Sequence, residues 1–353
     1  MDAPACDGWV SLAAARVQPH RVLTPDGDPL DGRQVTASAG EIEEMLELML
    51  LSRAFDERAT ALNRQGLFGG FAPVSGQEAC LVGSAAALDP ARDWIVPQYR
   101  ELPALVRHGY PLARLAAFSL GKSDAARVPE GVRILPLQFS LAAQLPHAVG
   151  LAWGRRLQGH REAVLAYCGE GATSEGDFHE ACNLAGVLRA PVVFVIQNNG
   201  WAISTPRAAQ TAAPNLAVRA LGYGFEGALV DGNDVLAVHQ VTRRAVERAL
   251  DGGGPALIEA ETYRLAVHNM TDDPRRYQPS HDLERARALD PLVRVVRHLR
   301  SAGALDEARE AELRRRAGER VLAAIAEARA MPVPEPRGLF DHVFAGSEEG
   351  SDG

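Results

Sequence analysis

Residues 163–204 contain two short apolar runs that are separated by a helix-like segment, and each run ends in a polar turn. The first run leads into Gly169-Glu170-Gly171, and the second leads into Asn198-Asn199-Gly200. Two strands joined by a helical crossover are parallel, and the crossover is right-handed in nearly all known cases. The pattern therefore predicts a strand–helix–strand unit of an α/β protein, with a parallel sheet and helices on both faces.

The two polar turns bring Glu170 and Asn199 to the same edge of the predicted sheet, because the carboxyl ends of parallel strands lie together. Open α/β sheets bind their ligands at this edge. A carboxylate and an amide oxygen beside a glycine-rich turn suit a hard cation such as Mg²⁺, which in turn could hold a diphosphate. The alternative is a plain loop in which glycine and asparagine serve only the turn. The pairing of both residues at neighbouring strand ends favours the site.

Two other segments carry residues that suit a diphosphate site. Gln98-Tyr99-Arg100-Glu101 follows a short predicted strand at 93–97 and opens a helix, where an arginine and a helix N-terminus favour a bound anion. His268 lies in a long polar loop, 263–280, with Asp272 and Asp273 close behind it, which fits an acid–base histidine. A surface turn and a solvated histidine are the respective alternatives.

The bulk properties restrict the class of protein. The chain has 353 residues and a net charge of −8, so nothing indicates a nucleic-acid partner. Its four cysteines lack the C-x-x-C spacing of a zinc site, and Cys80 and Cys168 stand in apolar surroundings typical of reduced thiols. No apolar run reaches the roughly 18 residues of a membrane span. We expect a cytoplasmic protein that binds no membrane.

The chain divides into three parts on composition. Residues 1–37 are rich in proline and Asp-Gly pairs and predict an irregular arm, of a kind that often lies on a partner subunit. Residues 38–330 form the predicted α/β domain. Residues 331–353 are proline-rich and then acidic, which predicts disorder. The segments expected to be helical are 38–65, 77–88, 102–120, 140–157, 235–250 and 283–330, and a mobile loop is expected at 121–137.

The chain resembles a known family, the α subunits of the thiamine-diphosphate-dependent 2-oxo acid dehydrogenases. These dehydrogenases are the E1 component of the pyruvate and branched-chain complexes. The resemblance runs from about residue 21 to residue 277. The segments that carry it are Gly76-Gln77-Glu78-Ala79, Gln98 to Glu101, Gln144 to Gly150, Gly169 to Asp177, Gln197 to Pro206 and Val230 to Asp234.

The resemblance implies a role for each candidate residue. Glu170, Asn199 and the carbonyl of Trp201 would hold Mg²⁺. Tyr99, Arg100 and Arg264 would bind the diphosphate of thiamine diphosphate, together with Gly169 and the backbone of Gly171 and Ala172. Leu141 would be the apolar buttress that bends the cofactor, and His268 would contact it and act in catalysis and acyl transfer. Gln98, Tyr99 and Phe139 would face the substrate.

The resemblance leaves the substrate and the regulation open. Gly169-Glu170-Gly171 and Gln98 favour a branched-chain 2-oxo acid, with pyruvate and acetoin as alternatives. Asn269 stands where mammalian members carry a regulatory phosphoserine, so that switch is absent. Phe139 and Ala143 replace the serine and threonine of some branched-chain members, which leaves a K⁺ site open. A cofactor-binding assembly subunit without activity is the non-enzymatic alternative.

The resemblance also implies partners. Thiamine diphosphate spans two α/β modules in this family, and the sequence contains strands for one. We therefore expect a separate β subunit, an α2β2 heterotetramer and a lipoylated E2 acyltransferase as the acceptor of the acyl group.

Overall fold

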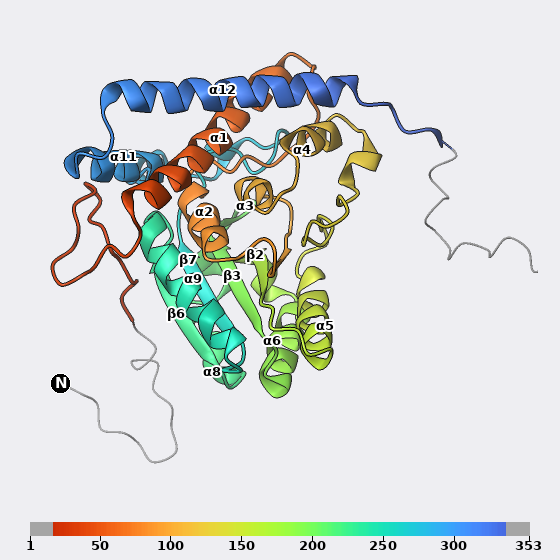
Figure 1. Ribbon diagram of the computed structural model, residues 1–353, viewed down its shortest axis with the longest axis vertical. Helices are drawn as coiled ribbons and strands as arrows, with labels where there is room; N and C mark the ends of the chain where they lie inside the picture. The colour runs from red at the N-terminus through yellow and green to blue at the C-terminus, as the bar shows by residue number, and fades with distance from the viewer. Residues whose placement is uncertain (1–16, 337–353) are drawn as a thin grey trace, which may run out of the picture.

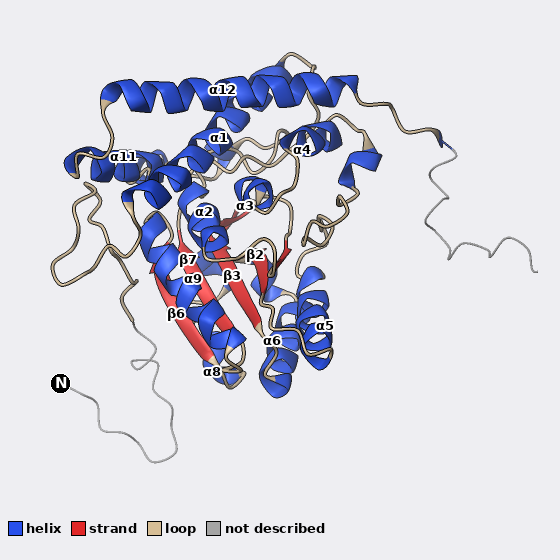
Figure 2. Ribbon diagram, viewed as in Figure 1, coloured by secondary structure: helices blue, strands red, loops and turns tan. Residues whose placement is uncertain are grey.

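The computed structural model describes residues 17–336 (Figure 1). At its centre lies a sheet of five parallel strands in the order β1-β2-β3-β7-β6, flanked by helices on both faces (Figure 2). This arrangement confirms the predicted fold class. The strands are β1 (Trp94–Val96), β2 (Val164–Gly169), β3 (Val192–Asn198), β6 (Glu226–Asp231) and β7 (Ala256–Glu261).

The predicted strand–helix–strand unit is β2, α6 (Gly176–Leu188) and β3. Every residue of β3 is buried, as its continuous apolar run requires of a strand covered on both faces. The two strands pair in register, with Gly169 opposite Gln197. Both strands therefore end at nearly the same level, and the turns that follow them start side by side.

The residues of the strands alternate between two cores. Leu165, Tyr167 and Val195 face the core shared with α1 (Ala39–Arg64), α2 (Glu78–Ala86) and α9 (Val235–Leu250). Ala166 and Phe194 face the opposite core, beneath α5 (Gln144–Leu157), α6 and α8 (Arg219–Gly222). This alternation follows from the period of two in a strand, and it gives three layers with the sheet in the middle.

The first described segment, residues 17–37, is hydrogen-bonded to the α/β domain of its own chain. Ser38 forms a capping box with Glu41 at the start of α1. Asp234 caps α9 and also accepts the backbone N–H groups of Val22 and Leu23 at 2.8 and 2.7 Å. The described part of the expected arm, residues 17–37, is therefore attached to its own chain at these buried positions. Residues 1–16 lie outside the described part.

Several predicted helices are interrupted. The segment 102–120 is two helices, α3 (Leu102–Arg107) and α4 (Leu112–Ser119), because Gly109 has a φ of 97° and Pro111 cannot continue a helix. The segment 283–330 is three helices: α10 (Ser280–Ala288), α11 (Pro291–Ser301) and α12 (Glu307–Ala330). Helix α5 begins at Gln144, after Ala142 with a φ of 63°, and not at residue 140.

The segment 121–137 carries more structure than a simple loop. It contains the short 3-10 helix η2 (Ser123–Ala126), and its buried Ile134 pairs with Ile95 of β1. Lys122 donates to the carbonyls of Ala328, Arg329 and Met331 at the end of α12, which lies across α1 and α4 (Figure 1). Residues 337–353, which hold most of the predicted disordered tail, lie outside the described part.

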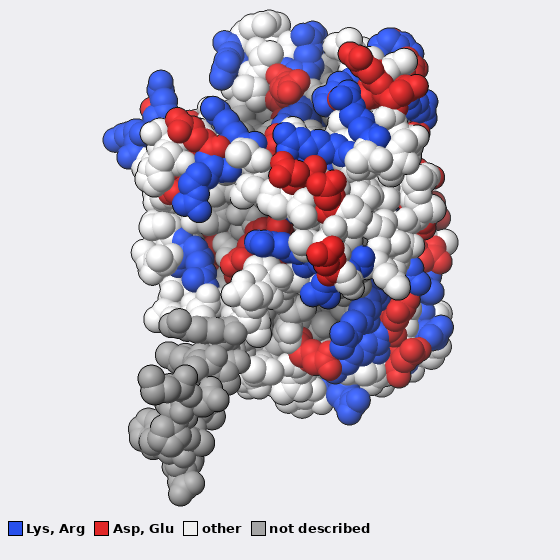
Figure 3. Space-filling view, turned by 90° about the vertical axis from the view of Figure 1, so that its left-hand side faces the viewer, with Lys and Arg blue, Asp and Glu red and all other residues white. Residues whose placement is uncertain are grey.

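The remaining short elements are η3 (Gly171–Ser174), β4 (Trp201–Ala202), β5 (Thr205–Pro206), α7 (Arg207–Gln210) and η4 (Pro274–Arg276). Within residues 17–336, no helix has the length and apolar character of a membrane span. Acidic and basic side chains are interspersed on the face shown in Figure 3.

Candidate active site

Glu170 and Asn199 meet at the carboxyl edge of the sheet, as the sequence predicts. The backbone N–H of Asn199 donates to Glu170 Oε2 at 3.3 Å, and both residues are buried. They lie at one end of a cavity of about 680 Å³. The convergence follows directly from the register of β2 with β3.

The Glu170 carboxylate is poorly satisfied by the protein itself. Its Oε1 atom is buried and has no hydrogen-bond partner among the described residues. Burial raises the pKa of Glu170, and nearby backbone N–H groups together with Arg264 and Arg100 oppose this effect only in part. A buried carboxylate oxygen without a partner fits a bound cation. Residues 17–336 contain no group of three or more acidic, histidine or cysteine side chains that could hold a metal ion. A cation at Glu170 would therefore take amide and carbonyl oxygens as further ligands.

Gly171 permits the close approach of two turns beside this carboxylate. It begins η3 directly after Glu170, and a Cβ atom at this position would lie 2.6 Å from the Cβ of Ala202 in β4. Glycine is therefore required here by contact, not by an unusual φ. The approach places the backbone of Gly171 and Ala172 on the cavity wall, where backbone N–H groups are suited to phosphate oxygens.

The segment from Gln98 to Arg100 is held in place by the buried carboxylate of Glu101. This carboxylate accepts the N–H groups of Gln98 and Arg100 at 3.0 and 2.8 Å, and the side chain of Gln197 at 2.6 Å. Gln98, Tyr99 and Arg100 all line the cavity. The Arg100 guanidinium donates to the carbonyls of Pro73 and His268, which fixes its direction.

His268 lies against two arginines. Its Nδ1 atom is 3.2 Å from Arg100 Nη2 and 3.4 Å from Arg264 Nη1. Burial and these two positive charges lower the pKa of His268 to about 4. A guanidinium can only donate, so Nδ1 is the acceptor and the proton of the neutral ring resides on Nε2. The loop is fixed by Asp272, which accepts the His268 N–H at 2.7 Å.

Arg264 is the one predicted site residue that the structure does not bring to the cavity wall. Its side chain is fully buried and donates to the carbonyls of Trp201 and Ile203 at 3.2 and 2.7 Å, and to the Tyr277 hydroxyl at 2.6 Å. Arg264 therefore connects the turn after β3 to the His268 loop from behind. Trp201 itself lines the cavity.

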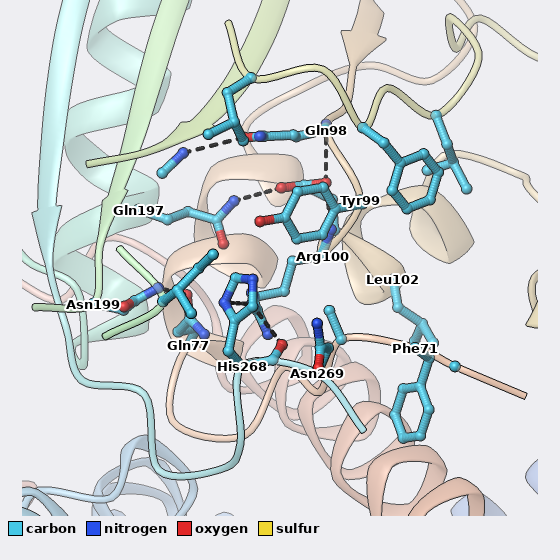
Figure 4. A pocket seen from close by; sticks show the side chains of 18 of the residues that line it. Phe71, Gln77, Gln98, Tyr99, Arg100, Leu102, Gln197, Asn199, His268 and Asn269 are labelled. Carbon is cyan, nitrogen blue, oxygen red and sulfur yellow. Dashed lines mark hydrogen bonds between the residues drawn. The ribbon is translucent and has the colours of Figure 1, made fainter. Parts of the chain in front are cut away.

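The other end of the cavity is apolar, with Phe71 and Leu102 on the side away from Asn199 (Figure 4). The ring of Phe139 stacks on Tyr99 with 5.6 Å between ring centroids, and on Phe118 with 5.9 Å. Phe139 and Leu141 are 57% and 41% exposed, although both are large apolar side chains. Further apolar side chains line this end: Phe55, Phe71, Leu102, Leu105, Leu115 and Leu137. The predicted site residues are thus distributed along one polar-to-apolar cavity.

Gln77 is a cavity residue that was not predicted as a site residue. Its Oε1 atom accepts a hydrogen bond from the Asn199 side chain at 3.1 Å, and Figure 4 shows the two side chains next to each other. The sequence contained a signal, since Gln77 follows Gly76 at the start of a helix within a motif of the family. Nothing in its spacing, however, connects it to Asn199, which is 122 positions away.

The fold and the cavity together define an α/β protein whose candidate site lies at the carboxyl edge of a parallel sheet, where a buried carboxylate, an amide and an arginine line one cavity. Residues 46–337 match the family described as dehydrogenase E1 component, and the chain belongs to this family. The family predicted from the sequence, the E1 α subunits of thiamine-diphosphate-dependent 2-oxo acid dehydrogenases, is therefore confirmed.

The relatives agree on the type of subunit. The chain is 42% identical over 310 residues to a protein of Staphylococcus epidermidis, covering 87% of this chain and 84% of the relative. It is 43% identical over 289 residues to one of Staphylococcus aureus, covering 82% and 78%. Both are named pyruvate dehydrogenase E1 component subunit alpha. These names support pyruvate, the alternative of the sequence analysis, better than the branched-chain substrate that it favoured.

Proposed function

We propose that this E1 α subunit contributes half of an active site that decarboxylates pyruvate oxidatively and transfers the acetyl group to the lipoyl group of an E2 acyltransferase. The observation that carries the proposal is the buried, unpartnered Oε1 of Glu170 beside Asn199, in a cavity that also contains Arg100 and His268. The names of the relatives support pyruvate as the substrate.

The polar end of the cavity fits Mg²⁺ and the diphosphate of thiamine diphosphate. Glu170 and Asn199 would hold the cation through side-chain oxygens, together with the carbonyl of Trp201. Arg100 and Tyr99 would bind the diphosphate beside the backbone of Gly171 and Ala172, since a fixed guanidinium and N–H groups suit phosphate oxygens. Arg264 would act indirectly, through its hold on the Trp201 carbonyl.

When bound, thiamine diphosphate supplies the electron sink that allows CO₂ to leave a 2-oxo acid. His268 holds a proton on Nε2 and has a pKa of about 4, so the ring stays neutral near pH 7 and donates a hydrogen bond to an oxygen of the substrate. Leu141 would support the cofactor from the apolar side, while Gln98, Tyr99 and Phe139 would face the substrate.

A β subunit would complete the site. The described residues form one five-stranded parallel sheet, and the cavity opens past three exposed apolar side chains: Phe139, Leu141 and Ile203. Large apolar groups gathered at an open mouth favour a covering partner. An α2β2 assembly would place the second module of the cofactor site over this mouth, and the lipoyl arm of E2 would enter beside it.

A second substrate is tested beside pyruvate, because large apolar side chains, among them Phe139 and Leu137, line one end of the cavity. That observation supports a branched-chain 2-oxo acid. The test is to co-express the chain with its β subunit and to measure kcat/KM for pyruvate, 3-methyl-2-oxobutanoate and acetoin with thiamine diphosphate and Mg²⁺.

Pyruvate is expected to give the highest kcat/KM, and the chain alone is expected to be inactive. A preference for 3-methyl-2-oxobutanoate or acetoin would overturn the substrate. Full activity of the isolated chain would overturn the shared site, and cofactor binding without turnover of any substrate would support the assembly subunit instead.

A further inference from the structure

Gln77 connects a part of the chain remote in sequence to the candidate cation site. It stands at the start of α2, is fully buried, and lines the same cavity as Glu170, next to Asn199 (Figure 4). Its Oε1 atom accepts the Asn199 Nδ2–H group at 3.1 Å. The three residues flank three different elements, α2, η3 and β3, so their meeting is a property of the tertiary structure.

The hydrogen bond determines which atom of the Asn199 amide is free. Its NH₂ group donates to Gln77, while its Oδ1 accepts the N–H of Trp201 at 3.2 Å and retains a second lone pair. If the amide turned over, its NH₂ group would point towards the cation and its oxygen would face the Gln77 oxygen. Gln77 and the Trp201 N–H therefore both disfavour the orientation that cannot bind a cation.

The two neighbours of Gln77 in the chain are held by close contacts. Gly76 has a φ of 96°, and a Cβ atom there would lie 2.2 Å from the carbonyl oxygen of Tyr263. The Gly76 N–H donates to Glu78 at 2.8 Å, and Glu78 is paired with Arg53 at 2.6 Å. The carbonyl of Gly76 accepts the Thr262 hydroxyl at 2.6 Å. These contacts hold the backbone on both sides of Gln77, and the side chain itself is held by its hydrogen bond to Asn199.

A second observation links Gln77 to a ligand and not to folding alone. Its Nε2 atom is buried and has no partner among the described residues, as is also true of Glu170 Oε1. Buried polar groups are almost always paired in folded proteins. One unpartnered hydrogen-bond donor and one unpartnered acceptor in the same cavity fit a ligand that contains both anionic oxygens and a cation.

We infer that Gln77 is a positioning residue, which orients the Asn199 amide so that its oxygen faces the bound Mg²⁺. This inference rests on the proposed function, because it requires a cation at Glu170 and Asn199. It predicts that the two residues are energetically coupled: Gln77 should matter more while residue 199 has an amide whose orientation must be chosen.

The experiment measures Mn²⁺ binding by electron paramagnetic resonance, with thiamine diphosphate present, in the full chain co-expressed with its β subunit. The variants are Gln77→Leu, Asn199→Asp and the double variant. Ser84→Ala is the matched control, since Ser84 is also buried on α2 and its hydroxyl bonds to Tyr167 at 2.8 Å, away from the cavity.

Gln77→Leu is expected to weaken Mn²⁺ binding on the order of tenfold or more, and Ser84→Ala to leave it within about twofold. An aspartate at 199 presents oxygens in either orientation, so the same Gln77 change should then weaken binding by less than about threefold. Equal effects in both backgrounds, or no effect in the wild-type background, would overturn the inference.

The outcomes separate this inference from the proposed function. If the wild-type assembly binds no Mn²⁺ in the presence of the cofactor, the proposed function fails. If the wild type binds Mn²⁺ and Gln77→Leu binds it equally well, only the positioning role fails. Should Gln77→Leu not fold, Gln77→Met, which keeps the length of the side chain, replaces it in the same cycle.

Discussion

Replacing Glu170 by glutamine is expected to make the metal-free chain more stable while abolishing its response to cofactor. Glu170 is 2% exposed, accepts the backbone N–H of Asn199 at 3.3 Å, and has an Oε1 atom without a partner among the described residues. Burying a carboxylate with so little compensation costs several kcal/mol. A neutral amide with one unpaired group costs about 1–3 kcal/mol. We therefore expect Glu170→Gln to raise the free energy of unfolding by about 1–3 kcal/mol near pH 7.5.

The sign of the pH dependence follows from the raised pKa of Glu170. The folded state holds this proton more tightly than the unfolded state, so the metal-free wild type loses stability as pH rises from the unfolded pKa through the folded one. Below that window both states are protonated, and the stability gap between wild type and Glu170→Gln closes. Above it the gap is fully present.

Ligand reverses the order of the two proteins. A cofactor–Mg²⁺ complex at 100 times its dissociation constant stabilises the wild type by about 2.7 kcal/mol, and it should add almost nothing to Glu170→Gln. Urea denaturation with and without thiamine diphosphate and Mg²⁺ measures all four values. A metal-free Glu170→Gln variant that is less stable than the wild type, or one that gains as much from ligand, would refute the reasoning.

Two other changes have defined outcomes. His268→Ala should spare cofactor affinity by calorimetry and lower kcat by about 10²–10⁴-fold, and an unchanged kcat would contradict the role. The pKa of His268 is lowered to about 4 in the folded protein, whereas in the unfolded chain it is about 6.5. The stability gained from the neutral ring is therefore present above about pH 6.5 and is lost as the pH falls towards 4. NMR titration of the ring measures this pKa. Lys122→Met should reduce the free energy of unfolding by about 2–4 kcal/mol, since it leaves three carbonyls at the end of α12 without their charged donor. Lys122 is the only lysine of the chain, so an amine reagent that labels it in the folded protein would contradict this burial.

The polar core of the site was predictable because it depends on local patterns. Two apolar runs with a helix between them imply parallel strands, and parallel strands place Glu170 beside Asn199. The same reasoning found Arg100 and His268, which also follow strands. Local signals for a helix break were present too, since Gly109 and Pro111 mark the end of α3 and the start of α4. Hydrophobic periodicity alone, however, predicted one continuous helix over 102–120.

The contacts that orient these side chains were not predictable, because they join distant elements. Arg264 follows a strand in sequence, yet its guanidinium turns behind the cavity to the carbonyls of Trp201 and Ile203. The hydrogen bond from the Gln197 side chain to Glu101 joins residues that are 96 positions apart. A sequence pattern fixes which face or edge a residue occupies, whereas the choice of hydrogen-bond partner depends on how the layers pack.

Three unpartnered polar atoms in this cavity support a bound ligand independently of any family. Gln77, Glu170 and Gln197 each bury an atom that has no partner among the described residues, and all three line the same space. Each such atom destabilises the fold by about 1–3 kcal/mol. Apolar side chains of similar size would avoid this loss, so folding alone does not account for the three polar residues. A ligand with both a cation and anionic oxygens would satisfy donors and acceptors together, which makes their combined presence an argument for binding and not for stability.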